Sequence, residues 1–293
     1  MPELTRFDVE IWIATVATGK FHYKSVCGLQ GRLDPKSDNK LRGIIWELCK
    51  KGVCESVGGK DGWYRPVEEI PMPVDFADTV EHKCFPVILP FDLSRYAFIY
   101  PNTAIIFAGS KSSCKTGAIY RTVAINMGKV DIILLSNMEG GREQMYDRFR
   151  AMGIDLAQVS KFVYHVSENF HDYIKQPNTL FLIDYIDAPE GTDFYLIGAA
   201  ISKIRKKLDN SVAIIGLQKP SFRDTAFGGE QTLKDAALYI ALDNIAAGKG
   251  KLKIVDAKVP ADKTIHPKNM QFTFKYEEEG TKFSDIKPYY GGD

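Results

Sequence analysis

The stretch Ala104-Ile-Ile-Phe-Ala-Gly109-Ser-Lys-Ser-Ser-Cys-Lys115-Thr116 decides the expected fold of this chain. An apolar run ends at a glycine, a short loop of small residues follows, and Lys-Thr opens a segment with helical periodicity. A strand, a loop and a helix in this order place backbone N–H groups and a helix N-terminus around an anion. The stretch therefore predicts a binding site for a triphosphate.

The residues of this loop have distinct expected roles. In the pattern G-x-x-x-x-G-K-[ST], backbone N–H groups surround the β-phosphate, the lysine reaches the β and γ oxygens, and the hydroxyl binds Mg²⁺. We expect Lys115 and Thr116 to take the last two roles, with ATP and Mg²⁺ as the bound species. The expected nucleotide-binding set is Gly109, Ser110, Lys111, Ser112, Ser113, Cys114, Lys115 and Thr116.

Cys114 stands where this pattern has its second glycine. A Cβ at this position costs roughly 1 kcal/mol or more if the backbone keeps a positive φ. Because cysteine is small, we expect the loop to close with a modest adjustment and to bind phosphate. The substitution bears more heavily on catalysis than on binding. The alternative interpretation is a serine-rich turn between a strand and a helix that binds no ligand.

The second half of the chain alternates between apolar strand-like runs and helix-like segments. Near-continuous apolar strands separated by helices predict an α/β fold, with a mostly parallel sheet sandwiched by helices. Two further ranges, 251–255 and 271–276, resemble a closing antiparallel pair, and we expect the polar tail from Glu277 to be loosely held. The strands are expected at 103–108, 130–136, 179–183, 212–217 and 238–242, and the helices at 115–127, 142–152 and 194–208.

Three strand ends supply candidate partners for the loop. Asp184 ends an apolar strand and is the expected second metal ligand, with Asp187 as the alternative. Glu139 follows the strand after the loop helix, and we expect it to act as the general base for water. It could instead only favour the N-terminus of the next helix. Gln218 ends a third strand and could sense the γ-phosphate. The expected catalytic residues are Glu139, Lys115 and Gln218, and the expected metal ligands are Thr116 and Asp184.

Together these motifs resemble the RecA-like ATPases, especially the branch with DnaB-type replicative helicases and RadA- or KaiC-type proteins. The resemblance runs from about residue 91 to 283 as a series of motifs rather than as continuous identity. Ile183-Asp184-Tyr185 is similar to the metal-binding strand of the helicases, whereas Glu139 lies one residue further along than in the family. The resemblance implies a RecA-like fold, with assembly into a ring or filament that binds ATP between subunits.

The range 252–258 resembles the strand in which the family often carries Lys-x-Arg, directed at a neighbouring subunit's γ-phosphate. Lys258 occupies the place of the arginine, so the resemblance implies that it acts in trans. Asp256 stands where a lysine is usual, which puts activation in trans in doubt.

The first 66 residues form a separate predicted module. Three helix-like segments, followed by a hairpin around the turn at 58–62, are the layout of a winged helix. The module carries eleven Lys or Arg against eight Asp or Glu, a mild positive bias. Its basic face could bind DNA, a protein partner or the ATPase domain. The expected domains are a winged-helix-like domain at 1–66, a proline-rich linker at 67–90 and a RecA-like ATPase domain at 91–293. The expected DNA-binding residues are Lys36, Asn39, Lys40, Arg42 and Lys60.

Composition limits the remaining possibilities. The chain has 293 residues, and 38 Lys or Arg against 37 Asp or Glu predict no general attraction to nucleic acid. No apolar run approaches the ~18 residues that would span a bilayer, and the N-terminus lacks a signal-peptide pattern. Five cysteines without CxxC spacing argue against a disulfide framework or a zinc site. We expect a cytoplasmic protein without a membrane partner.

The expected function is that of an ATP-binding and ATP-hydrolysing RecA-like ATPase that acts on or with DNA as an oligomeric motor. The alternative is a non-hydrolysing, nucleotide-dependent regulator or loader that engages DNA or a protein partner, and Cys114 and Asp256 favour it. A third hypothesis is a DNA-binding adaptor whose RecA-like fold binds no nucleotide. The sequence leaves the biological process and the number of subunits open.

Overall fold

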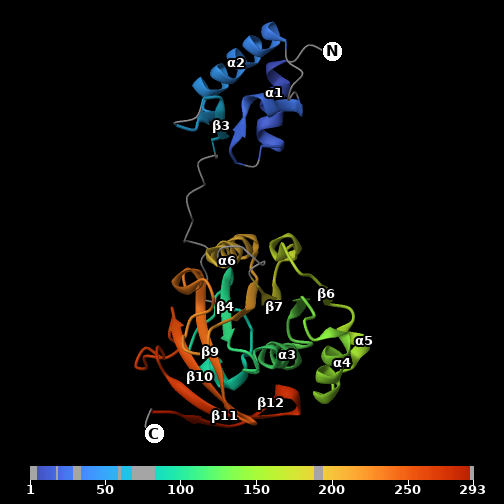
Figure 1. Ribbon diagram of the computed structural model, residues 1–293, viewed down its shortest axis with the longest axis vertical. Helices are drawn as coiled ribbons and strands as arrows, with labels where there is room; N and C mark the ends of the chain where they lie inside the picture. Colours follow the sequence, from blue (N-terminus) through green and yellow to red (C-terminus); the bar gives the residue numbers. More distant parts are fainter. Residues whose placement is uncertain are drawn as a thin grey trace. The chain divides into compact units, whose positions relative to one another are not determined.

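A computed structural model describes residues 5–17, 19–28, 34–58, 61–67, 83–187 and 194–290 of the chain (Figure 1). The chain divides into two compact units, Met1–Asp78 and Thr79–Asp293. Within the described ranges, no helix combines the length and the apolar composition that crossing a bilayer would require.

The first unit contains three helical segments and a three-stranded sheet in the order β1-β3-β2. The N-terminus of its longest helix is capped by Asp34, whose carboxylate accepts from the N–H groups of Lys36 and Ser37, both at 2.9 Å. Apolar side chains at helical spacing, among them Val9 and Ile13, form the core. The middle segment follows a short strand and is a 3₁₀ helix. The elements are α1 (Arg6–Thr15), β1 (Phe21–His22), η1 (Tyr23–Gly28), α2 (Pro35–Lys50), β2 (Cys54–Ser56) and β3 (Trp63–Pro66).

The second unit is built on a nine-stranded sheet in the order β12-β11-β10-β9-β4-β8-β7-β5-β6. The strands from β9 to β6 in this order run parallel, whereas β10, β11 and β12 are antiparallel to their neighbours. The strands are β4 (Thr103–Gly109), β5 (Asp131–Ser136), β6 (Val163–His165), β7 (Thr179–Ile186), β8 (Val212–Gln218), β9 (Ala236–Ala246), β10 (Lys249–Ala257), β11 (Gln271–Glu277) and β12 (Lys282–Pro288).

Helices cover both faces of the parallel part of this sheet. Side chains alternate along a strand, so Ile105 and Phe107 of β4 join the core beneath α3 and α4. Ile106 and Ala108 join a second core beneath α6 on the opposite face. The predicted α/β sandwich is confirmed. The helical elements are η2 (Pro90–Arg95), α3 (Lys115–Asn126), α4 (Gly141–Ala151), α5 (Leu156–Val159), η3 (Phe170–Tyr173), α6 (Tyr195–Lys207), η4 (Gly229–Thr232) and η5 (Glu278–Gly280).

The polar tail is part of the sheet, so the prediction of a loosely held tail was wrong. Strand β12 pairs antiparallel with β11 (Figure 1). The ring centroid of Phe283 lies 4.3 Å from that of Phe91 and 5.6 Å from that of Phe274. One aromatic side chain therefore anchors a strand whose other residues are mostly polar.

The chain ahead of Pro90 already packs on this unit. Phe85, Val87 and Leu89 are buried in the core beneath α3. The Asn126 side chain accepts from the N–H of Ile88 at 2.8 Å and donates to its carbonyl at 2.7 Å. The last residues of the expected linker therefore belong to the folded second unit.

The topology brings several strand ends together. The chain passes from β4 through α3 to β5, but β8 and β7 lie between these two strands in the sheet. In such open sheets, ligands bind at the carboxyl ends of the strands where the strand order changes direction. Gly109 pairs with Gln218 and Ser136 pairs with Asp184, so residues at or near the carboxyl ends of β4, β8, β5 and β7 meet at one edge.

Candidate nucleotide-binding site

The loop between β4 and α3 folds back on its first residue. A Cβ added to Gly109 would collide with Ser113 Oγ and would lie 2.9 Å from Lys115 Cβ, so only glycine fits there. The N–H of Ser113 donates to the Ser110 carbonyl at 3.2 Å, which closes a tight turn. The resulting curved loop ends at the N-terminus of α3, where free backbone N–H groups favour the binding of an anion.

One polar atom of the loop fits an anionic ligand directly. Ser113 Oγ is buried and, within the described residues, has no hydrogen-bond partner. Buried polar atoms are nearly always paired, so an unpaired hydroxyl in this position calls for an acceptor. Phosphate oxygens are such acceptors. The residues of the loop therefore fit a phosphate group.

Cys114 adopts the left-handed conformation that the motif assigns to glycine, with φ 64° and ψ 18°. Its side chain lies against the turn η5, because a Cβ added to Gly280 would lie 3.1 Å from Cys114 Sγ. A Cβ on Gly117, in the first turn of α3, would collide with the Gly280 carbonyl. The thiol therefore fills a position where the C-terminal hairpin covers the start of the helix.

The Cys114 thiol has low reactivity in this position. Burial raises its pKa to about 11. The thiolate is the reactive species of cysteine, so this thiol reacts slowly near neutral pH.

The two expected metal ligands lie together. Thr116 Oγ1 donates to Asp184 Oδ1 at 3.0 Å, and Asp184 is 4% exposed. Burial raises the pKa of Asp184, while the nearby Lys115 ammonium and hydrogen bonds from Thr116 and Tyr120 oppose that rise. Oxygen ligands of this kind suit Mg²⁺, which usually takes only one or two protein carboxylates beside phosphate oxygens. The pair therefore fits a phosphate-bound Mg²⁺. The described ranges contain no cluster of three or more His, Cys, Asp or Glu side chains that could hold a metal.

Lys115 and Glu139 both contact Tyr185, the residue after Asp184. The Lys115 ammonium lies over the Tyr185 ring, 3.7 Å from its centroid. The Tyr185 hydroxyl lies beside the Glu139 carboxylate, and both residues line the same cavity. Burial lowers the pKa of the Lys115 ammonium, and the carboxylates of Asp184, Glu139 and Asp187 oppose this shift.

Gln218 and the residue after it border the loop. The N–H of Lys219 donates to the Gly109 carbonyl at 3.0 Å. The Lys219 ammonium, which is fully buried, lies 2.6 Å from Asp243 Oδ1, and the Ser110 hydroxyl donates to the same oxygen at 3.1 Å. This ion pair fixes the start of the loop against the ends of β8 and β9. No local motif links Lys219 to Asp243, so this ion pair cannot be predicted from the sequence alone.

The predicted residues line one cavity of about 470 Å³. It is bordered by the loop from Ser110 to Thr116 and by Glu139, Asp184 and Gln218. Arg148 of α4 also lines it, and its positive charge acts on Asp184 and Cys114. Arg148 was not among the predicted site residues, because helical spacing alone does not show that this side chain faces the strand ends.

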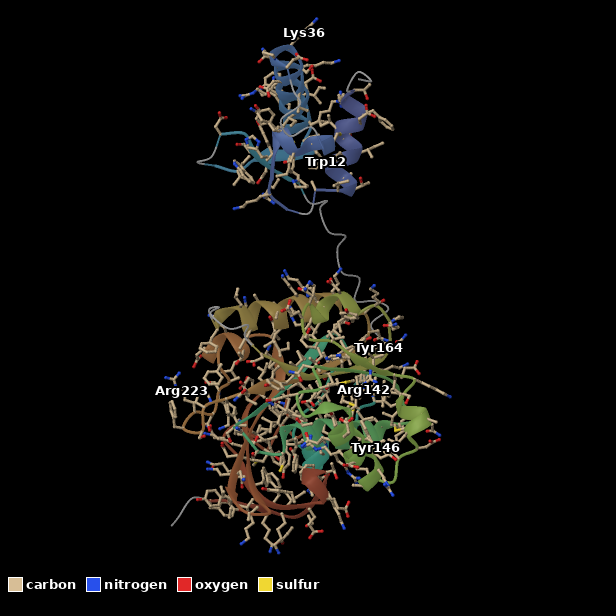
Figure 2. All side chains as sticks on the ribbon, turned by 45° about the vertical axis from the view of Figure 1, so that its right-hand side comes forward. Trp12, Lys36, Arg142, Tyr146, Tyr164 and Arg223 are labelled. Atoms are coloured by element: carbon tan, nitrogen blue, oxygen red, sulfur yellow. The ribbon has the colours of Figure 1, made fainter. Side chains whose placement is uncertain are left out.

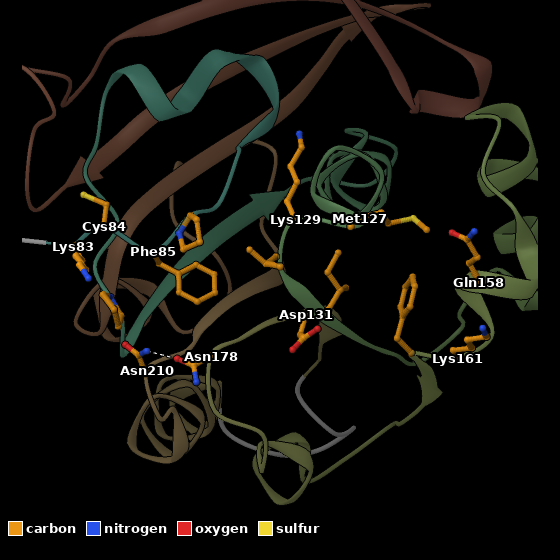
Figure 3. Close-up of a pocket in the computed structure, with 16 residues that line it drawn as sticks. Lys83, Cys84, Phe85, Met127, Lys129, Asp131, Gln158, Lys161, Asn178 and Asn210 are labelled. Atoms are coloured by element: carbon orange, nitrogen blue, oxygen red, sulfur yellow. Dashed lines mark hydrogen bonds between the residues drawn. The ribbon is translucent and has the colours of Figure 1, made fainter.

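A second, larger cavity lies at the opposite edge of the sheet. It measures about 840 Å³ and contains no residue of the predicted nucleotide site. Figure 3 shows Lys83 and Cys84 on one side of this cavity and Gln158 and Lys161 on the other. Phe85 and Phe162 give it an apolar lining.

Comparison with known proteins identifies the fold. No family model and no curated protein sequence matches this chain. A KaiC-like protein from Pyrococcus horikoshii OT3 superposes over 70% of this chain and 100% of its own, with a TM-score of 0.50 and 15% identity. The chain has the RecA-like fold.

Two other solved structures align with this chain at lower TM-scores. The RadB recombinase covers 64% of this chain and 92% of its own, with a TM-score of 0.46 and 14% identity. A DnaB-like replicative helicase covers 70% of this chain and 64% of its own, with a TM-score of 0.49 and 12% identity. At such identities the comparison establishes the fold alone.

The proposed trans-acting residue lies outside the cavity of the RecA-like unit. Lys258 follows β10, and its ammonium donates to the Lys234 carbonyl at 2.9 Å. Asp256, on β10, lies 3.4 Å from the Lys268 ammonium. Neither residue lines the cavity, so any contribution of Lys258 to ATP chemistry would have to reach another subunit.

The expected DNA-binding residues of the first unit lie on α2. Lys36, Asn39 and Lys40 are exposed, and Figure 2 shows Lys36 at the end of this helix. Arg42 is also exposed, but its guanidinium donates to the Tyr23 hydroxyl at 2.6 Å and to Asp38 at 3.1 Å. Lys60 lies outside the described residues.

Proposed function

We propose that the RecA-like unit binds ATP with Mg²⁺ and hydrolyses it. This proposal depends on one observation: side chains from separate segments of the chain line a single cavity beside an anion-binding loop. These residues are Lys115, Thr116, Asp184, Glu139 and Gln218. A strand end with a single acid would not indicate this function by itself. Phosphoryl transfer to water requires a phosphate-binding loop, ligands for one Mg²⁺ and a general base, and this cavity contains candidates for all three.

Each residue has a defined part in this proposal. The loop N–H groups and the Ser113 hydroxyl donate to the β-phosphate, and the Lys115 ammonium binds the β and γ oxygens. Thr116 and Asp184 would hold Mg²⁺, which when bound neutralises the charge on the phosphate oxygens. Arg148 adds a further positive charge to the same wall of the cavity.

Glu139 and Gln218 act on the water and the γ-phosphate. Glu139 is exposed at the cavity mouth and accepts the proton of the attacking water as general base. The Gln218 amide contacts the γ-phosphate, and β8 continues directly into the loop held by the Lys219 ion pair. Hydrolysis at the cavity is thereby linked to the loop after β8.

We further propose that the chain acts on or with DNA as an assembly of subunits. The exposed Lys36, Asn39 and Lys40 support a polyanion partner for the first unit. Assembly would place Lys258 within reach of another subunit's ATP.

The competing proposal is a nucleotide-dependent regulator that does not hydrolyse ATP. Two observations favour it: the left-handed Cys114, covered by the C-terminal hairpin, and Asp256 at a position where the family has a lysine. Both proposals require ATP binding in the same cavity and differ only in turnover.

The test combines ATP binding with ATP turnover, measured in the presence and absence of DNA, for the wild-type chain and Lys115→Ala. We expect wild-type binding and turnover, with both lost in Lys115→Ala. Lys129→Ala, a change of the same size at the other cavity, should leave both intact. Binding without turnover would favour the regulator, and absence of wild-type binding would contradict both proposals.

A further inference from the structure

Tyr185 touches two residues of the proposed ATP site with two different parts of its side chain. The face of the ring lies beneath the Lys115 ammonium, 3.7 Å from the centroid. The hydroxyl, at the far end of the ring, lies beside the Glu139 carboxylate, which lines the same cavity. One side chain therefore lies between the expected phosphate-binding lysine and the expected general base.

The position of Tyr185 is itself well fixed. It lies in β7 and is 7% exposed. Gly216, on the neighbouring strand β8, leaves room for it, since a Cβ added there would lie 3.2 Å from Tyr185 Cβ. The Asn137 side chain also donates to the Tyr185 carbonyl at 3.5 Å. A rigid strand thus presents the ring and the hydroxyl to the cavity.

The two residues that Tyr185 contacts are less constrained. Lys115 carries its charge at the end of a flexible four-carbon stem. Glu139 is exposed in the loop between β5 and α4, next to Met138, which has a positive φ of 52°. Catalytic geometry has to be held within about 0.5 Å, which flexible side chains achieve only with supporting contacts.

We propose that Tyr185 is a positioning residue of the ATP site, whose ring holds the Lys115 ammonium and whose hydroxyl orients the Glu139 carboxylate. This inference rests on the proposed function. A cation over an aromatic face is attracted by the ring quadrupole, most strongly when both are removed from water. A hydrogen bond from a fixed hydroxyl restricts a carboxylate to one orientation.

The two contacts can be removed separately. Tyr185→Phe keeps the ring beneath Lys115 and removes the hydroxyl, so ATP affinity should stay within about twofold of wild type while kcat falls. A hydrogen bond to a charged group corresponds to a factor of roughly ten to a hundred. Tyr185→Leu removes the ring as well, and the lost cation–ring contact should weaken ATP binding about threefold to thirtyfold.

The experiment measures the ATP dissociation constant, kcat and the thermal unfolding midpoint of both variants. Tyr164→Phe, on the edge strand β6, is the matched control, because its side chain is 47% exposed and lies outside the cavity. The expected result is a separation: Tyr185→Phe affects kcat alone, and Tyr185→Leu affects kcat and affinity.

Two outcomes would overturn the inference while leaving the proposed function in place. One is wild-type turnover by Tyr185→Phe; the other is a parallel loss of affinity, kcat and unfolding temperature in both variants, which would indicate general loosening. If the wild type binds ATP without turnover, the affinity of Tyr185→Leu decides: a weakened affinity supports the role of the ring, and an unchanged or tighter affinity contradicts it. Absence of ATP binding by the wild type would overturn the proposed function and this inference with it.

Discussion

Two cavities at opposite edges of the same sheet differ more in chemistry than in form. The cavity at the amino ends of the strands is the larger, about 840 Å³ against about 470 Å³ at the carboxyl ends. Its lysines come from loops and stand around an apolar lining. At the carboxyl ends, charged and hydroxyl side chains from several strand ends surround the N-terminus of α3. Convergent side-chain chemistry, rather than volume, distinguishes the candidate site.

The parallel strands explain this difference. Every parallel strand ends at the same edge, so Gly109, Ser136, Asp184 and Gln218 are neighbours although the sequence separates them widely. The helix that follows β4 also begins there, and its free N–H groups add anion affinity to the same edge. The amino edge holds the opposite helix ends, so it lacks this contribution.

The largest expected effect comes from replacing one carboxylate in each cavity by an amide and comparing ATP turnover. Glu139→Gln removes the proposed general base and should lower kcat by a factor of about 10² to 10⁴ while ATP binding is retained. Asp131→Asn makes the same change in the larger cavity and should leave turnover unchanged. Steady-state turnover with direct ATP titration checks both, and equal effects of the two variants would remove the functional distinction between the cavities.

A pair of glycines tests the backbone at each edge. In Gly109→Ala the new methyl group would collide with Ser113 Oγ, and overpacking of this kind costs about 1–3 kcal/mol of stability. Gly128, which lines the other cavity at a φ of +74°, has open space around it, so Gly128→Ala should cost only about 1 kcal/mol. Denaturant unfolding measures both. If Gly109→Ala is the milder change and still binds ATP, the loop is not packed as tightly as described.

A smaller expected difference concerns the alkylation rates of two cysteines, one at each cavity. Cys84 is exposed beside the larger cavity, whereas burial raises the pKa of Cys114 to about 11 from an ordinary value of 9.0. The folded chain therefore holds the Cys114 proton more tightly, and its thiolate stays scarce until the pH approaches that value. We expect alkylation at pH 8 to label Cys84 at least about tenfold faster than Cys114. Peptide mass spectrometry over time checks this, and faster labelling of Cys114 would contradict its burial against Gly280.

The smallest effect concerns the departure from the phosphate-loop motif. Cys114→Gly relieves a left-handed conformation that costs an L-residue about 1–2 kcal/mol, but it also removes the side chain that packs against Gly280. The relief of backbone strain and the loss of packing oppose each other, so the free energy of unfolding should change by less than about 1 kcal/mol. Thermal unfolding checks the stability, and turnover of the same variant measures how far the thiol limits catalysis. A large loss of stability would show that the contact with Gly280 dominates.

The sequence was most informative where structure is local. The loop from Gly109 to Thr116 and the acids and amide at three strand ends are short motifs, and each lies in the element type that was expected. Alternation of apolar strands with helices predicted the sheet and both of its covering layers. These features depend on neighbours along the chain, which is why a single sequence contains them.

Long-range contacts account for what the sequence did not predict. Strand β12 forms because Phe283 packs on Phe91, nearly two hundred residues earlier, and no local pattern in a polar tail indicates this. Arg148 and the ion pair between Lys219 and Asp243 are likewise close to the loop only after the sheet has formed. The role proposed for Tyr185 depends on contacts with Lys115 and Glu139, which lie in separate segments.

Hydrogen–deuterium exchange with and without Mg²⁺ and ATP tests the central claim most directly, because it reports which edge of the sheet binds the nucleotide. We expect slower exchange in peptides that cover residues 110–117 and 136–140, with no change in those covering 127–132 at the other cavity. Protection at 127–132, or no protection at either edge at saturating ATP, would contradict the assignment of the phosphate loop.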